Sequence, residues 1–530
     1  MTSTANSQKN LAASIGRNTL FGVLSNIAQV GTRLITVPIV IHHLGLGGYG
    51  IWNIIMATAT YMRFGSVGVK TAFQKYVAEA TGNGDYKRAN QLLSTGFAAM
   101  LVLSIAGLIP VALLSTQIAR AAGVPPEFLK SAAGAIALLA WIMVMANVGA
   151  TFEAIVMGGH RIDLVRKFGT LLTVAEAVAI VVVLHFGMGL YAMAAVMGIS
   201  ELLYITACYV VSKRVVPEIR LSLSHVTPKV LYELFRFAGS YQLVNLLEVL
   251  YGSILPFGIL RAFGPEYAGI YAVVNRVATS ASMLLDAFLP PILSGGTMVY
   301  AAGSSEKLQN LLVKAFKVTM GLSLFPLGFI AVFGPTMAYA WTGQTSPAFR
   351  VAFILFCMTT FFRAFSLLAL VLYRISGKAL LDNVRQVMRI AIILLVVFFA
   401  HRLGFFGVLA GLAFAELSGM IFMLFALART FLHFKIKALL PDALRMTIAA
   451  TIILGAGVVA SYIPLPARLG GQTLAVVKLA VIATACALAA WPSLTKTGSL
   501  SSSESHALFG SLFRRKSAPA TELATTPGKP

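Results

Sequence analysis

Apolar runs of membrane-spanning length follow one another along almost the whole of this chain. Windows of about 20 apolar residues, divided at proline, glycine and clusters of charge, predict fourteen transmembrane helices at approximately 19–41, 48–68, 92–115, 132–157, 168–186, 189–211, 237–260, 267–293, 315–334, 351–373, 380–400, 404–428, 444–463 and 473–492. Only 11% of the 530 residues are charged, against about 25% in soluble proteins. The chain is therefore predicted to be an all-α integral membrane protein, and a soluble enzyme is excluded.

The positive charges lie on one side of the predicted membrane. Alternate connections between spans fall into two sets, which carry 30 and 6 Lys and Arg residues. The basic set includes Lys70–Arg88, Lys213–Arg236, Lys307–Lys317 and Arg374–Arg389. Positive residues favour the cytoplasmic side, so both termini are predicted to be cytoplasmic. The net charge of +23 then indicates contact with anionic lipid rather than with nucleic acid.

The sequence predicts no catalytic group, cofactor or metal site. The cysteines, Cys208, Cys357 and Cys486, are far apart and lie inside apolar runs, which fits neither a disulfide framework nor a metal site. His42 and His43 have no third ligand nearby in the sequence. No phosphate-binding loop for ATP is present. These features favour a membrane transporter over an enzyme.

The chain contains an internal duplication. Pro38 to Gly45, followed by Tyr49-Gly50, recurs as Pro256 to Gly264, followed by Tyr267-Ala268-Gly269. Spans 1–6 and 7–12 are therefore predicted to be two copies in the same orientation, related by an axis along the membrane normal, with a substrate cavity between them. The expected segments are a cytoplasmic N-terminal segment (1–18), a first six-helix half (19–211), a cytoplasmic basic linker (212–236), a second six-helix half (237–428), a linker with helices 13 and 14 (429–492), and a disordered cytoplasmic tail (493–530).

A family resemblance starts at the first two spans. The pattern Pro38, Leu44-Gly45, Tyr49-Gly50, Phe64-Gly65 and Val77-Ala78-Glu79 resembles the opening of bacterial polysaccharide exporters and O-antigen flippases, within the multidrug/oligosaccharidyl-lipid/polysaccharide exporter superfamily. Many relatives have Asp before Leu-Gly at the end of span 2. This chain has Arg63 before Phe64-Gly65, so no role of that acid is carried over.

The resemblance implies a flippase of the bacterial cytoplasmic membrane that works by alternating access. Its substrate would be an undecaprenyl-pyrophosphate-linked oligosaccharide, moved from the inner to the outer leaflet. The implied partners are this lipid-linked oligosaccharide and the phospholipid bilayer. H⁺ or Na⁺ is the candidate coupling ion, and other glycan-assembly proteins are candidate partners.

Polar residues recur at helical spacing inside several spans. A charge at a helix centre costs roughly 2.5 to 3.5 kcal/mol on insertion scales, so these faces are not expected to contact lipid. The three stripes are Asn26, Gln29 and Arg33 on span 1; Tyr241, Asn245 and Glu248 on span 7; and Asn275, Thr279 and Asp286, beside Arg276, on span 8.

Two interpretations of these charges remain open: interhelical ion pairs and a hydrated cavity. The cavity interpretation assigns an anionic head group to four arginines, because the planar guanidinium fork matches phosphate oxygens. These are Arg33, Arg276, Arg63 and Arg363. The polar lining would be Asn26, Gln29, Asn245, Asn275 and Thr279. Glu248 and Asp286 would neutralise the arginines or bind the coupling ion. For Glu153, Glu176, Glu201 and Glu416, structural pairing is favoured.

Two other functions are considered. A multidrug cation antiporter of the same superfamily would favour acidic and aromatic cavity faces, whereas the intramembrane arginines favour an anion. A membrane glycan polymerase or ligase would need a large outer loop with catalytic groups. The outer loops of this chain are all short, which argues against that enzyme class.

Overall fold

The computed structural model describes residues 31–32, 34–59, 67–159, 161–301, 305–375, 380–430, 440–466 and 470–499. All regular structure within these ranges is helical. A first helix covers Leu34–Ala59. It is followed by α2 (Val67–Asn83), α3 (Tyr86–Leu113), α4 (Ser115–Ala121), α5 (Pro126–Gly158), α6 (Ile162–His185), α7 (Gly189–Val215), η2 (Leu223–His225), α8 (Pro228–Phe263), α9 (Pro265–Ala301), α10 (Ser305–Thr342), α11 (Ala348–Ile375), α12 (Leu380–Phe398), α13 (Ala400–Thr430), α14 (Leu440–Ala460) and α15 (Gly471–Lys496).

The helices coincide with the apolar runs of the sequence. Each of the twelve spans predicted after residue 90 has a helix of its own, and ten helices in the described ranges are long and apolar enough to cross a membrane. Residues 19–30 and 60–66, towards the predicted cytoplasmic ends of the first two spans, lie outside the described ranges. The prediction of an all-helical, multi-pass membrane protein is confirmed.

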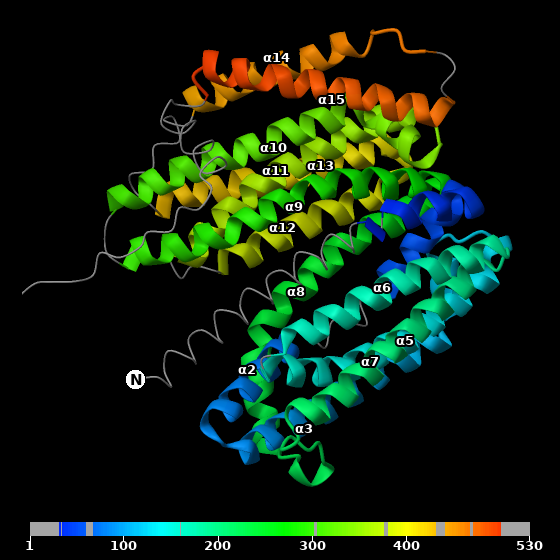
Figure 1. The fold of residues 1–530 in the computed structure, drawn as a ribbon, viewed down its shortest axis with the longest axis vertical. Helices are drawn as coiled ribbons and strands as arrows, with labels where there is room; N and C mark the ends of the chain where they lie inside the picture. The colour runs from blue at the N-terminus through cyan, green and yellow to red at the C-terminus, as the bar shows by residue number, and fades with distance from the viewer. Residues whose placement is uncertain are drawn as a thin grey trace, which may run out of the picture.

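Two lobes make up the bundle (Figure 1). Helices α2, α3, α5, α6 and α7 pack together as the first lobe, and α9 to α13 pack together as the second. The long helix α8 runs between the two lobes. It contacts α2 and α3 of the first lobe and α9, α12 and α13 of the second. Helices α14 and α15 pack on each other and on α10, and an apolar pocket of about 290 Å³ lies between these three helices.

Several basic segments predicted as connections are largely helical. Helix α2 occupies most of Lys70–Arg88, because Phe73, Val77 and Ala80 recur at helical spacing and are buried. Helix α12 begins at Leu380, as the predicted span 380–400 does, so counting the second part of Arg374–Arg389 as a basic connection is wrong. The charge asymmetry survives this correction, since it rests on many other residues.

The two lobes meet at one end through equivalent parts of the sequence duplication. Gly45 and Gly264 have φ values of +69° and +87°, which break the helical path at corresponding points. Immediately after them, residues 46–50 lie against residues 265–269 with backbone touching backbone. A Cβ atom added to Gly50 would lie 2.5 Å from the oxygen of Pro265 and 2.6 Å from the nitrogen of Gly269. We call this the outer contact, because the charge pattern predicts that this end faces away from the cytoplasm.

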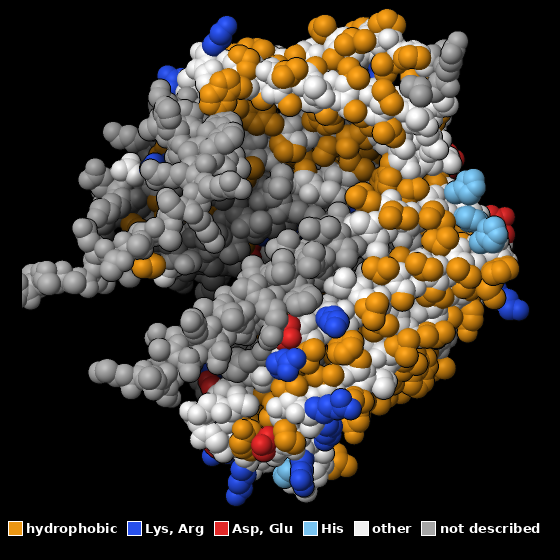
Figure 2. Space-filling model, viewed as in Figure 1, with side chains coloured by type: hydrophobic (Ala, Val, Ile, Leu, Met, Phe, Trp, Pro, Cys, Tyr) orange, Lys and Arg blue, Asp and Glu red, His pale blue; other side chains and the backbone are white. Residues whose placement is uncertain are grey.

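The lobes diverge from the outer contact towards the opposite end (Figure 1). The space-filling view shows the molecule hollowed between them (Figure 2). In the same view, apolar side chains cover the flank of the first lobe, and Lys and Arg gather towards the end of that lobe far from the outer contact. This distribution agrees with a lipid-facing flank and a basic inner end.

The linker between the lobes is fastened to the first lobe. Side chains of α3 form four hydrogen bonds with its backbone. These bonds are Asn90 Nδ2 to the oxygen of Glu218 (3.2 Å), the nitrogen of Arg220 to Asn90 Oδ1 (2.9 Å), the nitrogen of Ser222 to Ser94 Oγ (3.1 Å) and the nitrogen of Thr227 to Thr95 Oγ1 (3.1 Å). Residues 218–227 therefore belong structurally to the first lobe.

Candidate functional site

The structure describes five of the eleven predicted site side chains. Arg33, Arg63, Asn26 and Gln29 lie outside the described residues. Asn245 and Asp286 lie on α8 and α9, but their side chains are also outside the described set. The remaining five are Asn275, Arg276 and Thr279 on α9, Glu248 on α8 and Arg363 on α11.

The three α9 residues form a half-buried polar stretch close to the outer contact. The Thr279 hydroxyl donates to the carbonyl oxygen of Asn275 at 2.6 Å. Arg276 acts electrostatically on the hydroxyl of Tyr49 in the helix Leu34–Ala59. Among the described side chains, Arg276 forms no ion pair.

Glu248 and Arg363 are brought together from α8 and α11. Arg363 Nη2 donates to Glu248 Oε1 at 3.2 Å, and the two side chains are 41% and 42% exposed. The second carboxylate oxygen, Oε2, accepts a hydrogen bond from Gln386 Nε2 of α12. A predicted anion-binding residue and a predicted ion-coupling residue are thus partners in one ion pair.

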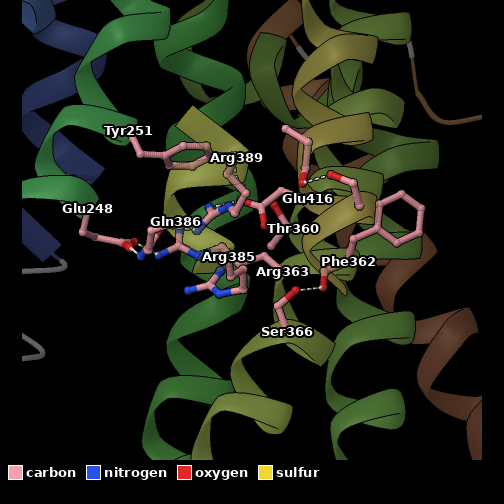
Figure 3. A network of polar contacts seen from close by, with 12 residues as sticks. Glu248, Tyr251, Thr360, Phe362, Arg363, Ser366, Arg385, Gln386, Arg389 and Glu416 are labelled. Carbon is pink, nitrogen blue, oxygen red and sulfur yellow. Dashed lines mark hydrogen bonds and ion pairs between the residues drawn. The ribbon is translucent and has the colours of Figure 1, made fainter. Parts of the chain in front are cut away.

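A chain of polar contacts continues from this pair into the second lobe (Figure 3). Gln386 Oε1 accepts from Arg389 Nη1 at 2.7 Å, and Arg389 Nη2 forms an ion pair with Glu416 of α13. The Tyr251 hydroxyl of α8 donates to Glu416 Oε1 at 2.7 Å, and its ring lies 3.7 Å below the Arg389 guanidinium. The Arg389 and Glu416 side chains are 1% exposed. The chain therefore joins an accessible ion pair to a fully buried one.

One stripe of α12 supplies most of the donors in this chain. Asp382, Arg385, Gln386 and Arg389 are spaced three, four and seven residues apart, so they share one face of the helix. Arg385 donates to Asp382 Oδ1 through Nε at 2.9 Å and through Nη2 at 2.6 Å. With Arg363, Glu248 and Glu416 included, the cluster contains three bases and three acids, and its formal charge is zero. An isolated charge at this depth would be costly, so the pairing explains how the charges are accommodated.

Arg385 and Arg389 were missed as site residues, because they were counted with the basic connection Arg374–Arg389 although they also fall inside the predicted span 380–400. The spacing of an acid, an amide and two bases along one face, next to the apolar run 390–398, is the signal that identifies this stripe. The expected structural pairing of Glu416 is confirmed by its contact with Arg389. In the first lobe, Glu176 hydrogen bonds with Ser200, and Glu153 and Glu201 act electrostatically on Tyr204.

The polar chain ends in a partly exposed ion pair, Glu248–Arg363. Charged side chains in membrane spans lie towards the bundle interior or a water-filled space. Glu248 is on α8, which runs between the lobes, and 41% of its side chain is exposed. We therefore expect this exposed end to face the hollow between the lobes, where a polar solute can approach Arg363.

The fold, two helical lobes that meet at one end and diverge at the other, is similar to the folds of solved membrane transporters and flippases. The structure is similar to the inward-facing conformation of a multidrug resistance MATE family transporter, with a TM-score of 0.62 and 16% identity over 76% of this chain and 97% of the other. It is also similar to the lipid II flippase MurJ in an inward closed conformation, with a TM-score of 0.62 and 13% identity over 93% and 100% of the two chains.

The chain belongs to the polysaccharide biosynthesis protein family, whose model matches residues 15–294. The uncharacterized membrane protein EpsK of Bacillus subtilis (strain 168) is 20% identical over 315 residues, which cover 58% of this chain. The match spans 61% of the length of EpsK. The family resemblance in the opening spans is thereby confirmed.

Proposed function

We propose that the chain is a flippase that moves an undecaprenyl-pyrophosphate-linked oligosaccharide across the bacterial cytoplasmic membrane. The observation that carries this proposal is a partly exposed guanidinium inside the membrane domain: the Arg363 side chain, on α11, is 42% exposed. A guanidinium there fits a phosphate group with two parallel hydrogen bonds. Membership of the polysaccharide biosynthesis protein family supports a glycan precursor as the substrate.

Alternating access is the proposed mechanism. In the described conformation the outer contact closes one end, and the hollow widens towards the basic end. The head group would enter from the inner leaflet and bind Arg363 and Arg276, with Arg33 and Arg63 proposed to complete the anion site. Separation of the outer contact and closure of the inner end would then release it outwards. Glu248 and Asp286 remain the proposed ion-coupling residues.

The proposed substrate charge also provides a driving force. A pyrophosphate diester carries about two negative charges, and each is worth about 2.3 kcal/mol per 100 mV of membrane potential. An inside-negative potential would therefore favour outward movement by up to about 5 kcal/mol at 100 mV. This force acts without ATP.

Transport of the labelled lipid-linked oligosaccharide in proteoliposomes tests the proposal. Arg363→Ala and Arg276→Ala should each lower the initial rate by tenfold or more, and Arg→Lys should restore only part of it, because an ammonium lacks the planar fork. Arg402→Ala is the control, since Arg402 is an exposed arginine on α13 beside Phe399. Full transport by both alanine variants, inserted at the normal level, would remove these arginines from the mechanism.

A cation antiporter is the second candidate, and the accessible carboxylate of Glu248 is the observation that favours it. It predicts uptake of a fluorescent organic cation driven by a pH or Na⁺ gradient and abolished by Glu248→Gln. Flipping of the lipid-linked oligosaccharide without cation transport would exclude this function.

A further inference from the structure

Glu248 is paired with the guanidinium group of Arg363, to which the proposed substrate would bind. Its Oε1 atom lies 3.2 Å from Arg363 Nη2, at the position where a phosphate oxygen would accept the same hydrogen bond. Its Oε2 atom is held by Gln386. The Gln386 amide therefore holds one oxygen of the Glu248 carboxylate while the other oxygen accepts from Arg363.

The Glu248–Arg363 ion pair differs from the other ion pairs of this cluster in its exposure. Its side chains are 41% and 42% exposed, whereas Arg385–Asp382 and Arg389–Glu416 are at most 5% exposed. Exposed ion pairs contribute only about 0.2 to 1 kcal/mol, but breaking a buried one costs several kcal/mol. Of the three pairs, this is the one that a solute can open at low cost.

We propose that Glu248 is an internal competitor for the anion site: its carboxylate neutralises Arg363 in the empty protein and is displaced when the substrate's phosphate groups bind. This inference rests on the proposed function, because it assigns Arg363 to the substrate anion. Gln386 retains the displaced carboxylate through Oε2, so Glu248 returns to Arg363 when the anion leaves.

The competition gives the empty protein a neutral site. A bare guanidinium in the membrane domain would have to be carried through the return step at an electrostatic cost. With Glu248 in place, the charge of Arg363 is compensated whenever no substrate is bound. With substrate in place, the anion replaces Glu248 as the partner of Arg363. The competition therefore compensates the charge of Arg363 in the substrate-free half of the transport cycle.

Binding of inorganic pyrophosphate to the purified full-length protein, measured by isothermal titration calorimetry, tests the proposal. Glu248→Gln keeps the size and hydrogen-bonding capacity of the side chain but removes its charge. Its affinity for pyrophosphate should be up to about fivefold higher than that of the wild type, as expected for loss of a competing ion pair worth at most about 1 kcal/mol. Adding Arg363→Gln to this variant should abolish the gain.

The matched control lies on the same helix. Glu233, near the start of α8, pairs with Arg88, and these side chains are 48% and 44% exposed. Glu233→Gln therefore changes the net charge equally and opens an equally exposed pair, but outside the proposed site. It should leave pyrophosphate affinity within twofold of the wild type.

The possible results separate the inference from the proposed function. If Glu248→Gln binds pyrophosphate no more tightly than the wild type while Arg363→Gln binds it more weakly, the anion site stands and the competition is refuted. An equal gain in the Glu233→Gln control would show a general charge effect and would also refute it. If Arg363→Gln changes neither pyrophosphate binding nor oligosaccharide flipping, the proposed anion site itself fails.

Discussion

The close backbone approach at the outer contact leads to a prediction about the equilibrium between the outer-closed and outer-open conformations. Gly50→Ala adds a methyl group where the nearest atoms are the Pro265 oxygen at 2.5 Å and the Gly269 nitrogen at 2.6 Å. Ordinary Cβ contacts begin at about 3.4 Å, so the backbones must separate by close to 1 Å. Both neighbours are backbone atoms, which cannot rotate away as a side chain would.

The size of the effect follows from the cost of overpacking. Such insertions cost about 1 to 3 kcal/mol, and each 1.4 kcal/mol is a tenfold change in an equilibrium. The ratio of outer-closed to outer-open protein should therefore fall by about 5- to 140-fold. Gly269→Ala should act in the same direction, because its added methyl group would meet the carbonyl oxygen of Leu46.

Distances between spin labels at the inner end of the lobes measure this ratio. Labels on Ser224 and Asn310, both exposed, report the separation of the two lobes there. The native cysteines are buried, so introduced cysteines can be labelled selectively. Gly50→Ala should shift the distribution to shorter distances. Gly455→Ala is the control, since its added methyl group has no neighbour within 4 Å. An unchanged distribution in folded Gly50→Ala protein would refute the role of the outer contact.

Three further predictions concern stability, topology and energetics. Glu416→Ala should destabilise the protein by about 3 to 5 kcal/mol in a steric-trapping measurement, because Arg389 is left buried without its counter-charge, and replacing both by apolar residues should recover most of the loss. In intact cells, a cysteine at Pro347 should react with an impermeant thiol reagent and one at Ser224 should not; the reverse would overturn the orientation. In proteoliposomes, a valinomycin-set K⁺ potential alone should accelerate flipping in the direction that expels anions, whereas a rate that follows only a pH or Na⁺ gradient would favour carboxylate-coupled antiport.

Hydrophobic length predicted the helices of this protein well, because a span needs about 20 apolar residues whatever it packs against. Charges near the ends of spans were harder to assign. Arg385 and Arg389 fall inside the predicted span 380–400 but were counted with the connection before it, whereas the structure buries both on α12. The sequence does contain a signal that places these arginines in a helix: Asp382 and Gln386 lie on the same helical face.

The pairing inside the site could not be predicted from the sequence. Glu248 and Arg363 are 115 residues apart and lie on different helices, so helical spacing says nothing about their distance. From the sequence, each charged residue is expected to need polar surroundings inside the membrane. That expectation concerns one residue at a time and does not identify its partner. Which acid meets which base depends on the packing of α8 against α12 and on the rotation of each helix about its axis.

The fastening of the linker has a consequence for biosynthesis. Because α3 already binds the backbone of residues 218–227, the first lobe can satisfy this segment before any of the second lobe has left the ribosome. The start of α8 is then fixed in place as Val230 and Leu234 pack on Leu92. The second lobe would thus be inserted beside an already folded first lobe, which positions the start of α8. The two lobes would therefore assemble in the order in which they are synthesised.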